Sequence, residues 1–277
     1  MKELEIGTLL RPYDLTREHL TFLKHAGLET SQFARVSDDF MSGEAGRKKT
    51  AEQFGLLKEY GLGCASLFLC MPPDTTGDGY APEAVRTARM LFACRQFLWA
   101  KAQGIPYMTA HVGALSKVPQ GEAYERMVRD FRQLCRFAED NGQFFLFETG
   151  PEPVSWLKRF FADVDSPNLG INFDPANFLC YNTDTPANLV AELGDRVKVV
   201  HCKDAVPPQA GETNGHETVL GKGATDFAAL LGTLLDQGYR GPLIIERELP
   251  SGPEQRADVA AAITFLQELR ATRTARN

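Results

Sequence analysis

The sequence predicts a single α/β domain in which eight parallel strands alternate with helices and close into a (β/α)8 barrel. Eight short apolar runs of strand character are separated by segments with helical periodicity, which is the order of a parallel sheet with helical crossovers. The 277 residues match the roughly 250 residues that one such barrel needs. No linker-like stretch divides the chain, so we expect one domain over residues 1–277.

The predicted strands are apolar runs of a few residues each. They lie at residues 4–10, 28–33, 62–70, 105–111, 143–148, 169–174, 197–202 and 243–246. The clearest helices lie at residues 84–103 and 124–139, where apolar side chains recur at helical spacing. Because strand and helix repeat in this order, we expect parallel strands joined by right-handed crossovers.

Glycines support these boundaries independently of the apolar pattern. Helical segments end at Gly27, Gly61, Gly104, Gly142 and Gly238, each shortly before a predicted strand or its apolar run. A left-handed residue at the C-terminal end of a helix suits glycine best, because glycine has no Cβ.

Composition favours an enzyme or binding protein for small molecules. The formal net charge is −6, with 36 acidic and 30 basic side chains, so the chain lacks the broad basic field of nucleic-acid-binding proteins. No run approaches the roughly 18 consecutive apolar residues of a membrane helix, and the N-terminus lacks the apolar core of a signal peptide. We therefore expect a cytoplasmic protein without nucleic-acid or membrane partners; a homo-oligomer is compatible with the sequence.

The six cysteines do not form a recognisable metal or redox motif. No CxxC pair occurs among them, and several fall within apolar runs where a small thiol packs well. We expect reduced core residues at Cys64, Cys70, Cys94, Cys135, Cys180 and Cys202.

Acidic or imidazole residues stand at the exits of four predicted strands: Glu148, Asp174, His201 and Glu246. A single carboxylate after a strand is more often a helix cap or an ion-pair partner. Four such residues in this order favour a shared site, because the carboxyl ends of the strands meet on one face of the barrel. Three carboxylates and one imidazole suit Mn²⁺, Mg²⁺ or Co²⁺, with Zn²⁺ less diagnostic.

Strand alternation tests this prediction, because residues two apart in a strand share a face. Asn172 and Asp174 share one face, which we expect to point into the barrel. His201 shares its face with Lys203, whereas Cys202 points away and is not expected to be a ligand. Spacing alone leaves either Glu246 or Glu248 possible as the last ligand, although Glu246 lies nearer the strand.

At these residues the chain resembles the xylose-isomerase-like TIM-barrel superfamily of sugar isomerases and epimerases. The resemblance covers nearly the whole chain and is most specific between Glu148 and Glu246. The matching pieces are Phe147-Glu148-Thr149-Gly150 with Glu152, Asn172-Phe173-Asp174-Pro175-Ala176-Asn177, Val200-His201-Cys202-Lys203-Asp204, Leu220-Gly221-Lys222-Gly223 with Asp226, and Ile245-Glu246. This resemblance implies that Glu148, Asp174, His201 and Glu246 bind one divalent metal ion, for which we favour Mn²⁺.

The resemblance also implies an isomerase or epimerase that acts on a sugar or a related hydroxy-carbonyl compound. In the ketose 3-epimerase branch the two ligand glutamates, here Glu148 and Glu246, act as acid and base. Removal of a proton next to a carbonyl gives an enediolate that a metal stabilises. Return of the proton to the other face is epimerisation, and its return to the neighbouring carbon is isomerisation. The alternatives are a metal-dependent dehydratase or lyase of a sugar or inosose, and a sugar-binding barrel without turnover.

Three further residues are candidates for substrate contact. His111 ends a predicted strand, and Lys203 shares the face of His201. Asn177 stands where related epimerases usually place a histidine; asparagine can bond a hydroxyl but cannot carry a proton at neutral pH. The related DNA-repair endonucleases need additional histidines for several zinc ions, so Asn177 and the acidic charge argue against that branch.

Two long loops are expected to follow predicted strands and to cover the site. They lie at residues 71–82 and 203–225 and are rich in Pro, Gly and polar residues. Gly221-Lys222-Gly223 lies in the second segment. A short GxG sequence is weak evidence for phosphate binding, so we favour a turn before a helix capped by Thr225 or Asp226, with Asp204 bracing the segment.

Overall fold

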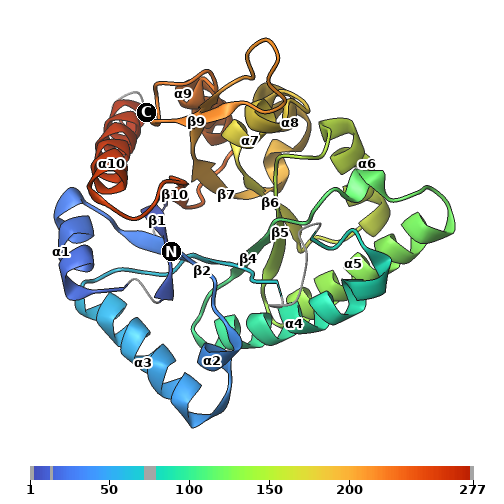
Figure 1. The fold of residues 1–277 in the computed structure, drawn as a ribbon, viewed down its shortest axis with the longest axis horizontal. Helices are drawn as coiled ribbons and strands as arrows, with labels where there is room; N and C mark the ends of the chain where they lie inside the picture. The colour runs from blue at the N-terminus through green and yellow to red at the C-terminus, as the bar shows by residue number, and fades with distance from the viewer. Residues whose placement is uncertain (1–2, 13–14, 72–78, 275–277) are drawn as a thin grey trace.

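The computed structural model describes residues 3–12, 15–71 and 79–274, and they form the predicted closed barrel of eight parallel strands (Figure 1). The order around the barrel is β1-β10-β7-β6-β5-β4-β3-β2. Its strands are β1 (Ile6–Leu10), β2 (Thr30–Ala34), β3 (Ser66–Phe68), β4 (Tyr107–Ala110), β5 (Phe144–Glu148), β6 (Leu169–Phe173), β7 (Val197–Cys202) and β10 (Leu243–Ile245). Seven of them lie within a predicted run, and β2 extends one residue beyond its run, to Ala34; several strands are shorter than predicted.

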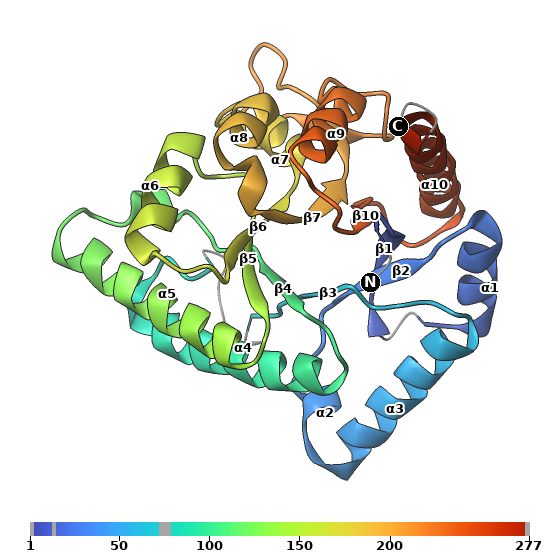
Figure 2. The same cartoon turned by 180° about the vertical axis from the view of Figure 1, so that it is seen from behind.

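Helices form a ring outside the strands, as both views of the ribbon show (Figures 1 and 2). They are α1 (Arg17–Ala26), α2 (Asp38–Met41), α3 (Gly43–Glu59), α4 (Glu83–Ala102), α5 (Glu122–Asp140), α6 (Val154–Val164), α7 (Pro175–Tyr181), α8 (Pro186–Leu193), α9 (Phe227–Asp236) and α10 (Pro253–Thr274). The two clearest predicted helices are confirmed as α4 and α5. Short 3₁₀ turns lie at Leu115–Lys117 and Gly194–Arg196.

The glycines predicted to end helices adopt the required backbone. The φ angles of Gly27, Gly61, Gly104, Gly142 and Gly238 are +102°, +62°, +75°, +70° and +94°. These values lie in the left-handed region that only glycine enters without steric cost, which explains why the chain turns back toward the barrel at these points.

Two apolar layers support the site. The larger layer lies between the strands and the surrounding helices, and the smaller one fills the barrel interior with Leu146, Val199 and Ile244. Val199 precedes His201 by two residues in β7, so the small apolar cluster lies directly beneath His201 on the same face. The barrel interior is therefore apolar below and polar at its carboxyl end.

The segment at residues 203–225 contains secondary structure that the sequence did not predict. Strands β8 (Asp204–Val206) and β9 (His216–Thr218) pair in an antiparallel two-stranded sheet, with Asp204 opposite Thr218. The expectation of a simple loop was wrong here, because strands of three residues leave no recognisable alternation. Most of the other long segment, residues 72–78, lies outside the described part of the chain.

Asp204 holds this segment together from within. Its carboxylate accepts hydrogen bonds from the backbone N–H groups of Ala205, Gly221, Gly223 and Thr225 at 2.9–3.2 Å, and from the Thr225 hydroxyl at 2.8 Å. A Cβ at Gly223 would lie 2.2 Å from Asp204 Oδ1, so this approach requires glycine. The amides of Gly221 and Gly223 thus bind an internal carboxylate, in agreement with the predicted turn and bracing role of Asp204.

The structure also shows the state of the cysteines and the apolar character of the helices. All six cysteines are free; Cys135 and Cys202 are buried and the other four are half-buried. Within the described residues, no helix combines the length and apolar character needed to cross a membrane.

We expect Asp204→Ala to lower the free energy of unfolding by about 3 kcal/mol, because it leaves several N–H groups without their charged acceptor. Asp140→Ala, at an exposed position at the end of α5, should change the same quantity by less than about 0.5 kcal/mol. Urea unfolding followed by circular dichroism measures both. Equal stability of the two variants would contradict a bracing role for Asp204.

Candidate metal centre and active site

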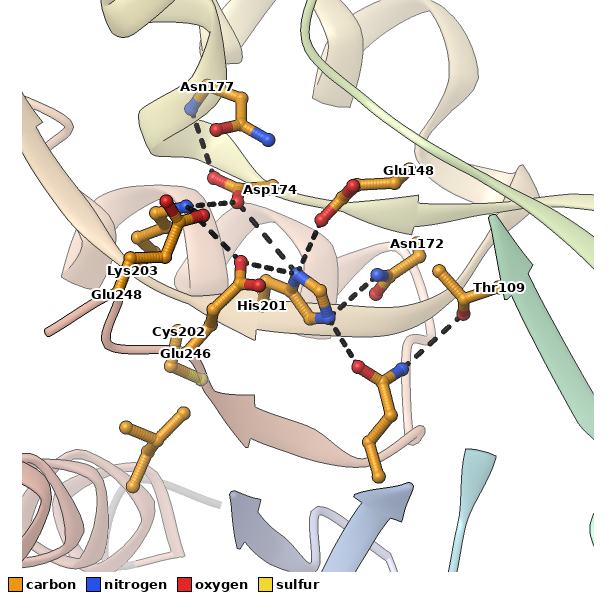
Figure 3. Close-up of polar contacts among 12 residues, drawn as sticks. Thr109, Glu148, Asn172, Asp174, Asn177, His201, Cys202, Lys203, Glu246 and Glu248 are labelled. Atoms are coloured by element: carbon orange, nitrogen blue, oxygen red, sulfur yellow. Dashed lines mark hydrogen bonds and ion pairs between the residues drawn. The ribbon is translucent and has the colours of Figure 1, made fainter. Parts of the chain in front are cut away.

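The structure brings together the four residues that the sequence singled out. Glu148 ends β5, Asp174 follows β6, His201 lies in β7 and Glu246 follows β10. Each offers one ligand atom, and these atoms all lie within 4.8 Å of one another (Figure 3). The convergence follows from the barrel, whose parallel strands carry their carboxyl ends to one face.

His201 lies at the centre of the group. Its Nδ1 atom is 3.1 Å from Glu148 Oε1, 3.1 Å from Glu246 Oε2 and 3.8 Å from Asp174 Oδ2. The side chain is fully buried, as is that of Asp174. One ring nitrogen therefore faces three carboxylates at once.

Gln32 in β2 determines how the imidazole presents that nitrogen. Gln32 Nε2 donates to Ser66 Oγ at 2.8 Å, so its amide oxygen faces His201 Nε2, also at 2.8 Å. Asn172 Nδ2 also lies 2.8 Å from His201 Nε2. With the Gln32 oxygen as acceptor, Nε2 keeps its proton, and Nδ1 is the nitrogen that can lose its proton to bind a metal among the carboxylates.

Two buried atoms in this group lack a hydrogen-bond partner. They are Asp174 Oδ2 and His201 Nδ1. Buried polar atoms are nearly always bonded, so two such atoms that lie 3.8 Å apart call for a further group. A divalent cation fits this requirement, because three carboxylates and one imidazole nitrogen are ligands that such ions accept.

Local sequence explains how Asp174 reaches this position. It is the N-terminal cap of α7, where its Oδ1 accepts from Asn177 N at 3.0 Å, and Pro175 occupies the first helical position. Aspartate followed by proline is a favoured start of a helix. Since Oδ1 is used by the cap, Oδ2 remains directed at His201.

Burial and neighbouring charges shift the pKa values of the two glutamates in opposite directions. Burial raises the pKa of Glu148 to about 7. Burial alone would also raise the pKa of Glu246, but the charges of His201 and Lys203 outweigh it and hold that pKa below its ordinary value. Burial would lower the pKa of His201, yet the carboxylates, Glu246 foremost, raise it well above its ordinary value.

Lys203 lies at the edge of the group and contacts both C-terminal glutamates. Its Nζ atom is 3.3 Å from Glu246 Oε2, 3.6 Å from Asp174 Oδ2 and 2.6 Å from Glu248 Oε1. Glu246 belongs to the four-residue group, whereas the Glu248 side chain is 64% exposed and contacts Lys203 instead. The position nearer the strand is therefore the one that faces His201.

The other two predicted substrate residues lie around this group. Asn177 Nδ2 donates one of its two N–H bonds to the carbonyl oxygen of Thr149 at 3.1 Å, which leaves the other N–H and the amide oxygen for a substrate hydroxyl. His111 follows β4, outside the four-residue group, with its ring centroid 6.5 Å from that of Tyr181. Burial lowers the pKa of His111, so its neutral form is favoured.

A cavity of about 1320 Å³ opens beside the group. Glu246 and Phe68 line it, together with residues after β1, β2 and β3 and at the start of α10. The Phe68 ring lies nearly parallel to the His201 ring, at 19° and 6.2 Å between centroids. A cavity that adjoins a group of converging ionisable side chains is the expected place for a small-molecule site.

Sequence reasoning missed Gln32 and Phe68. Gln32 is a polar side chain on the interior face of a buried strand, and that mismatch with the apolar pattern was a usable signal. Phe68 offered none, because an aromatic residue in a strand is ordinary.

Known proteins share this fold. A model of the xylose isomerase-like TIM barrel matches residues 20–269. A crystal structure of a xylose isomerase domain protein from Planctomyces limnophilus has 30% sequence identity and a TM-score of 0.86, covering 98% of each chain. A D-allulose 3-epimerase from Methylomonas sp. in complex with D-allulose shares the fold at 18% identity and a TM-score of 0.70, covering 97% of this chain and 98% of that chain.

Similarity to curated proteins covers less of the chain. Inosose dehydratase of Lacticaseibacillus casei is 25% identical over 143 residues, which are 46% of this chain and 48% of that protein. The match thus spans about half the length of that relative. The family model covers most of the chain, and the barrel with its acidic and imidazole group agrees with it: the chain belongs to the family of xylose isomerase-like TIM barrels.

Proposed function

We propose that this protein is a divalent-metal-dependent isomerase or epimerase of a sugar or related hydroxy-carbonyl compound. The observation that supports this most is the pair Glu148 and Glu246, which approach His201 Nδ1 from different strands at the same distance of 3.1 Å. Strands β6 and β7 separate β5 from β10 in the barrel, so the two carboxylates lie on different sides of the group (Figure 3).

The two glutamates suit opposite roles in proton transfer. A pKa near 7 allows Glu148 to hold or release a proton at neutral pH, whereas the lowered pKa of Glu246 keeps it ionised. Environments that move two carboxyl groups apart in this way are a recurring arrangement for an acid and a base. Glu246 would take a proton from the carbon next to the carbonyl, and Glu148 would return one from the other face.

Glu148, Asp174, His201 and Glu246 would hold the metal ion, for which we favour Mn²⁺ over Mg²⁺, Co²⁺ and Zn²⁺. A divalent ion bound there supplies positive charge that stabilises negative charge on substrate oxygens. Lys203, Asn177 and His111 would contact the substrate around it: Lys203 through its ammonium group, Asn177 through its amide oxygen and His111 through its neutral ring.

A dehydratase is the second candidate. The curated relatives that match part of the chain include inosose dehydratases and a mannonate dehydratase. Dehydration also begins with loss of a proton next to a carbonyl, after which a hydroxyl leaves with the help of an acid. Glu148, with its raised pKa, could supply that acid, so the two candidates differ in the product rather than in the first step.

We expect Asp174→Ala and Glu246→Ala to weaken Mn²⁺ binding by more than about a hundredfold. Removing a residue that only hydrogen-bonds a metal ligand can already lower metal affinity up to about a hundredfold, and removal of the ligand itself should cost more. Glu248→Ala is the matched control and should retain the metal, because Glu248 lies outside the group. Calorimetric titration of the metal-free proteins measures this. Full occupancy in Asp174→Ala would rule out the ligand assignment.

Metal affinity should rise with pH between about pH 6 and pH 8. Without metal, the raised pKa values of Glu148 and His201 mean that both groups bind protons that an ion must displace. Below about pH 7 two protons are displaced, and above it only the proton of His201, so the dependence should be steeper on the acidic side. Titrations with Mn²⁺ across this range, in buffers of different ionisation enthalpy, measure the protons released. A pH-independent affinity would contradict the assignment.

Glu148→Gln and Glu246→Gln should each reduce turnover by at least about a hundredfold, because each removes one proton-transfer group. A panel of ketoses, aldoses and inososes assayed with Mn²⁺ in deuterium oxide identifies the reaction. An isomerase or epimerase yields a product that carries solvent deuterium on carbon, whereas a dehydratase yields a product lighter by one water.

Metal content must be measured beside activity, because both residues also belong to the metal group. A metal-loaded protein that binds sugars but converts none would support a binding barrel instead.

A further inference from the structure

Four arginines line the cavity beside the metal centre, and two of them lack a carboxylate partner. Arg247 is paired with Glu217 and Asp258, and Arg256 with Glu18. The other two are Arg11 and Arg35.

Within the described part of the chain, neither Arg11 nor Arg35 makes an ion pair or a side-chain hydrogen bond. The protein carries a net charge of −6, so carboxylates for pairing are abundant. Two cations left unpaired in one cavity are therefore available to a ligand.

The barrel places both arginines at its mouth. Arg11 directly follows β1 and Arg35 directly follows β2, just as the four acidic and imidazole residues lie at the ends of β5, β6, β7 and β10. β1 pairs with β10, which leads to Glu246, and also with β2. One side of the mouth thus carries the metal group and the adjoining side carries the two guanidinium groups.

Alternation directs Arg11 inward. A Cβ at Gly7 would lie 2.7 Å from Ile244 Cδ1, and Ile244 belongs to the apolar cluster inside the barrel. Gly7 therefore faces the interior, and so do Leu9 and Arg11 at spacings of two residues. Both of these residues line the cavity.

Arg35 reaches the same cavity through an unusual backbone conformation. Gln32 faces the interior, so strict alternation would direct Ala34 inward and Arg35 outward toward the helices. Instead, Arg35 has a φ of +59°, in the left-handed region that a residue with a long side chain rarely adopts, and it lines the cavity. Such strained positions are typical of binding sites. Its charge also acts on Cys70 at the exit of β3, where it partly offsets the rise that burial causes in the thiol pKa.

We propose that Arg11 and Arg35 bind an anionic group, carboxylate or phosphate, on the substrate of the metal centre. The guanidinium forks match the oxygens of such a group. Phe68 lines the same cavity, and its ring, stacked with that of His201, offers an apolar surface to the carbon skeleton. The substrate is then a sugar acid or a sugar phosphate rather than a neutral sugar. This inference rests on the proposed function and specifies its substrate class.

The test measures equilibrium binding of matched probes to the Mg²⁺-loaded protein by calorimetry: D-fructose, D-fructose 6-phosphate and D-gluconate. At least one anionic probe should bind at least about tenfold more tightly than D-fructose, as expected for charge-assisted contacts from two arginines. Preference for the phosphate alone, for the gluconate alone or for both identifies the anionic group. If neither anionic probe binds more tightly than D-fructose, the proposal is wrong.

Variants separate the arginines from the metal as the source of this preference. Arg11→Met and Arg35→Asn should each remove most of the preference while metal content stays unchanged; asparagine tolerates the left-handed backbone, so Arg35→Asn tests the guanidinium rather than the strain. Arg136→Met, on the exposed face of α5, removes the same charge and should keep the preference. A preference that survives in both arginine variants would assign it to the metal and overturn the proposal.

The outcome is independent of turnover. A selective anion site in a protein that fails the deuterium assay would refute the proposed reaction and keep this inference. Deuterium incorporation into neutral sugars, with no anion preference, would keep the reaction and refute this inference.

Discussion

The burial of three carboxylates around one imidazole is the constraint on which the rest of the site depends. Charged groups away from water are costly unless an opposite charge lies close by, and here Glu148, Asp174 and Glu246 share a space of a few ångströms. His201 and Lys203 supply the opposite charge within the chain. Two atoms still lack a partner, which is why the group is best understood as the binding site of a divalent ion.

Rigid surroundings keep these groups at their distances. An apolar cluster of Leu146, Val199 and Ile244 fills the barrel below His201, and Gln32 holds the far side of its ring. On the outside, Asp204 binds the amides of the following segment, directly after Lys203. Preorganisation of this kind costs stability locally, but it spares the site reorganisation when charge develops during a reaction.

Two of the proposed ligands are also the proposed proton carriers, so metal binding and proton transfer cannot be separated by deleting either glutamate. Glu148 and Glu246 differ in surroundings rather than in chemistry: Lys203 contacts Glu246 but not Glu148. This difference is what would give one carboxyl group the role of acid and the other that of base. The arginines after β1 and β2 would then place a charged substrate relative to both.

The sequence by itself determined the fold class and, apart from the choice between Glu246 and Glu248, the residues at the centre of the site. Strand and helix periods differ, and a helix that ends in a left-handed turn favours glycine there, so the repeating pattern was visible, with five helix ends marked by Gly27, Gly61 and their counterparts. The convergence of Glu148, Asp174 and His201 followed from parallel strands alone, because their carboxyl ends must meet on one face. Tertiary structure decided what depends on contacts between distant segments. It selected Glu246 over Glu248, joined Gln32 to His201 across 169 positions, and turned Arg35 into the cavity against the alternation of its strand. A local pattern specifies which face a side chain occupies, but only the closed barrel specifies which side chains from other strands it meets there.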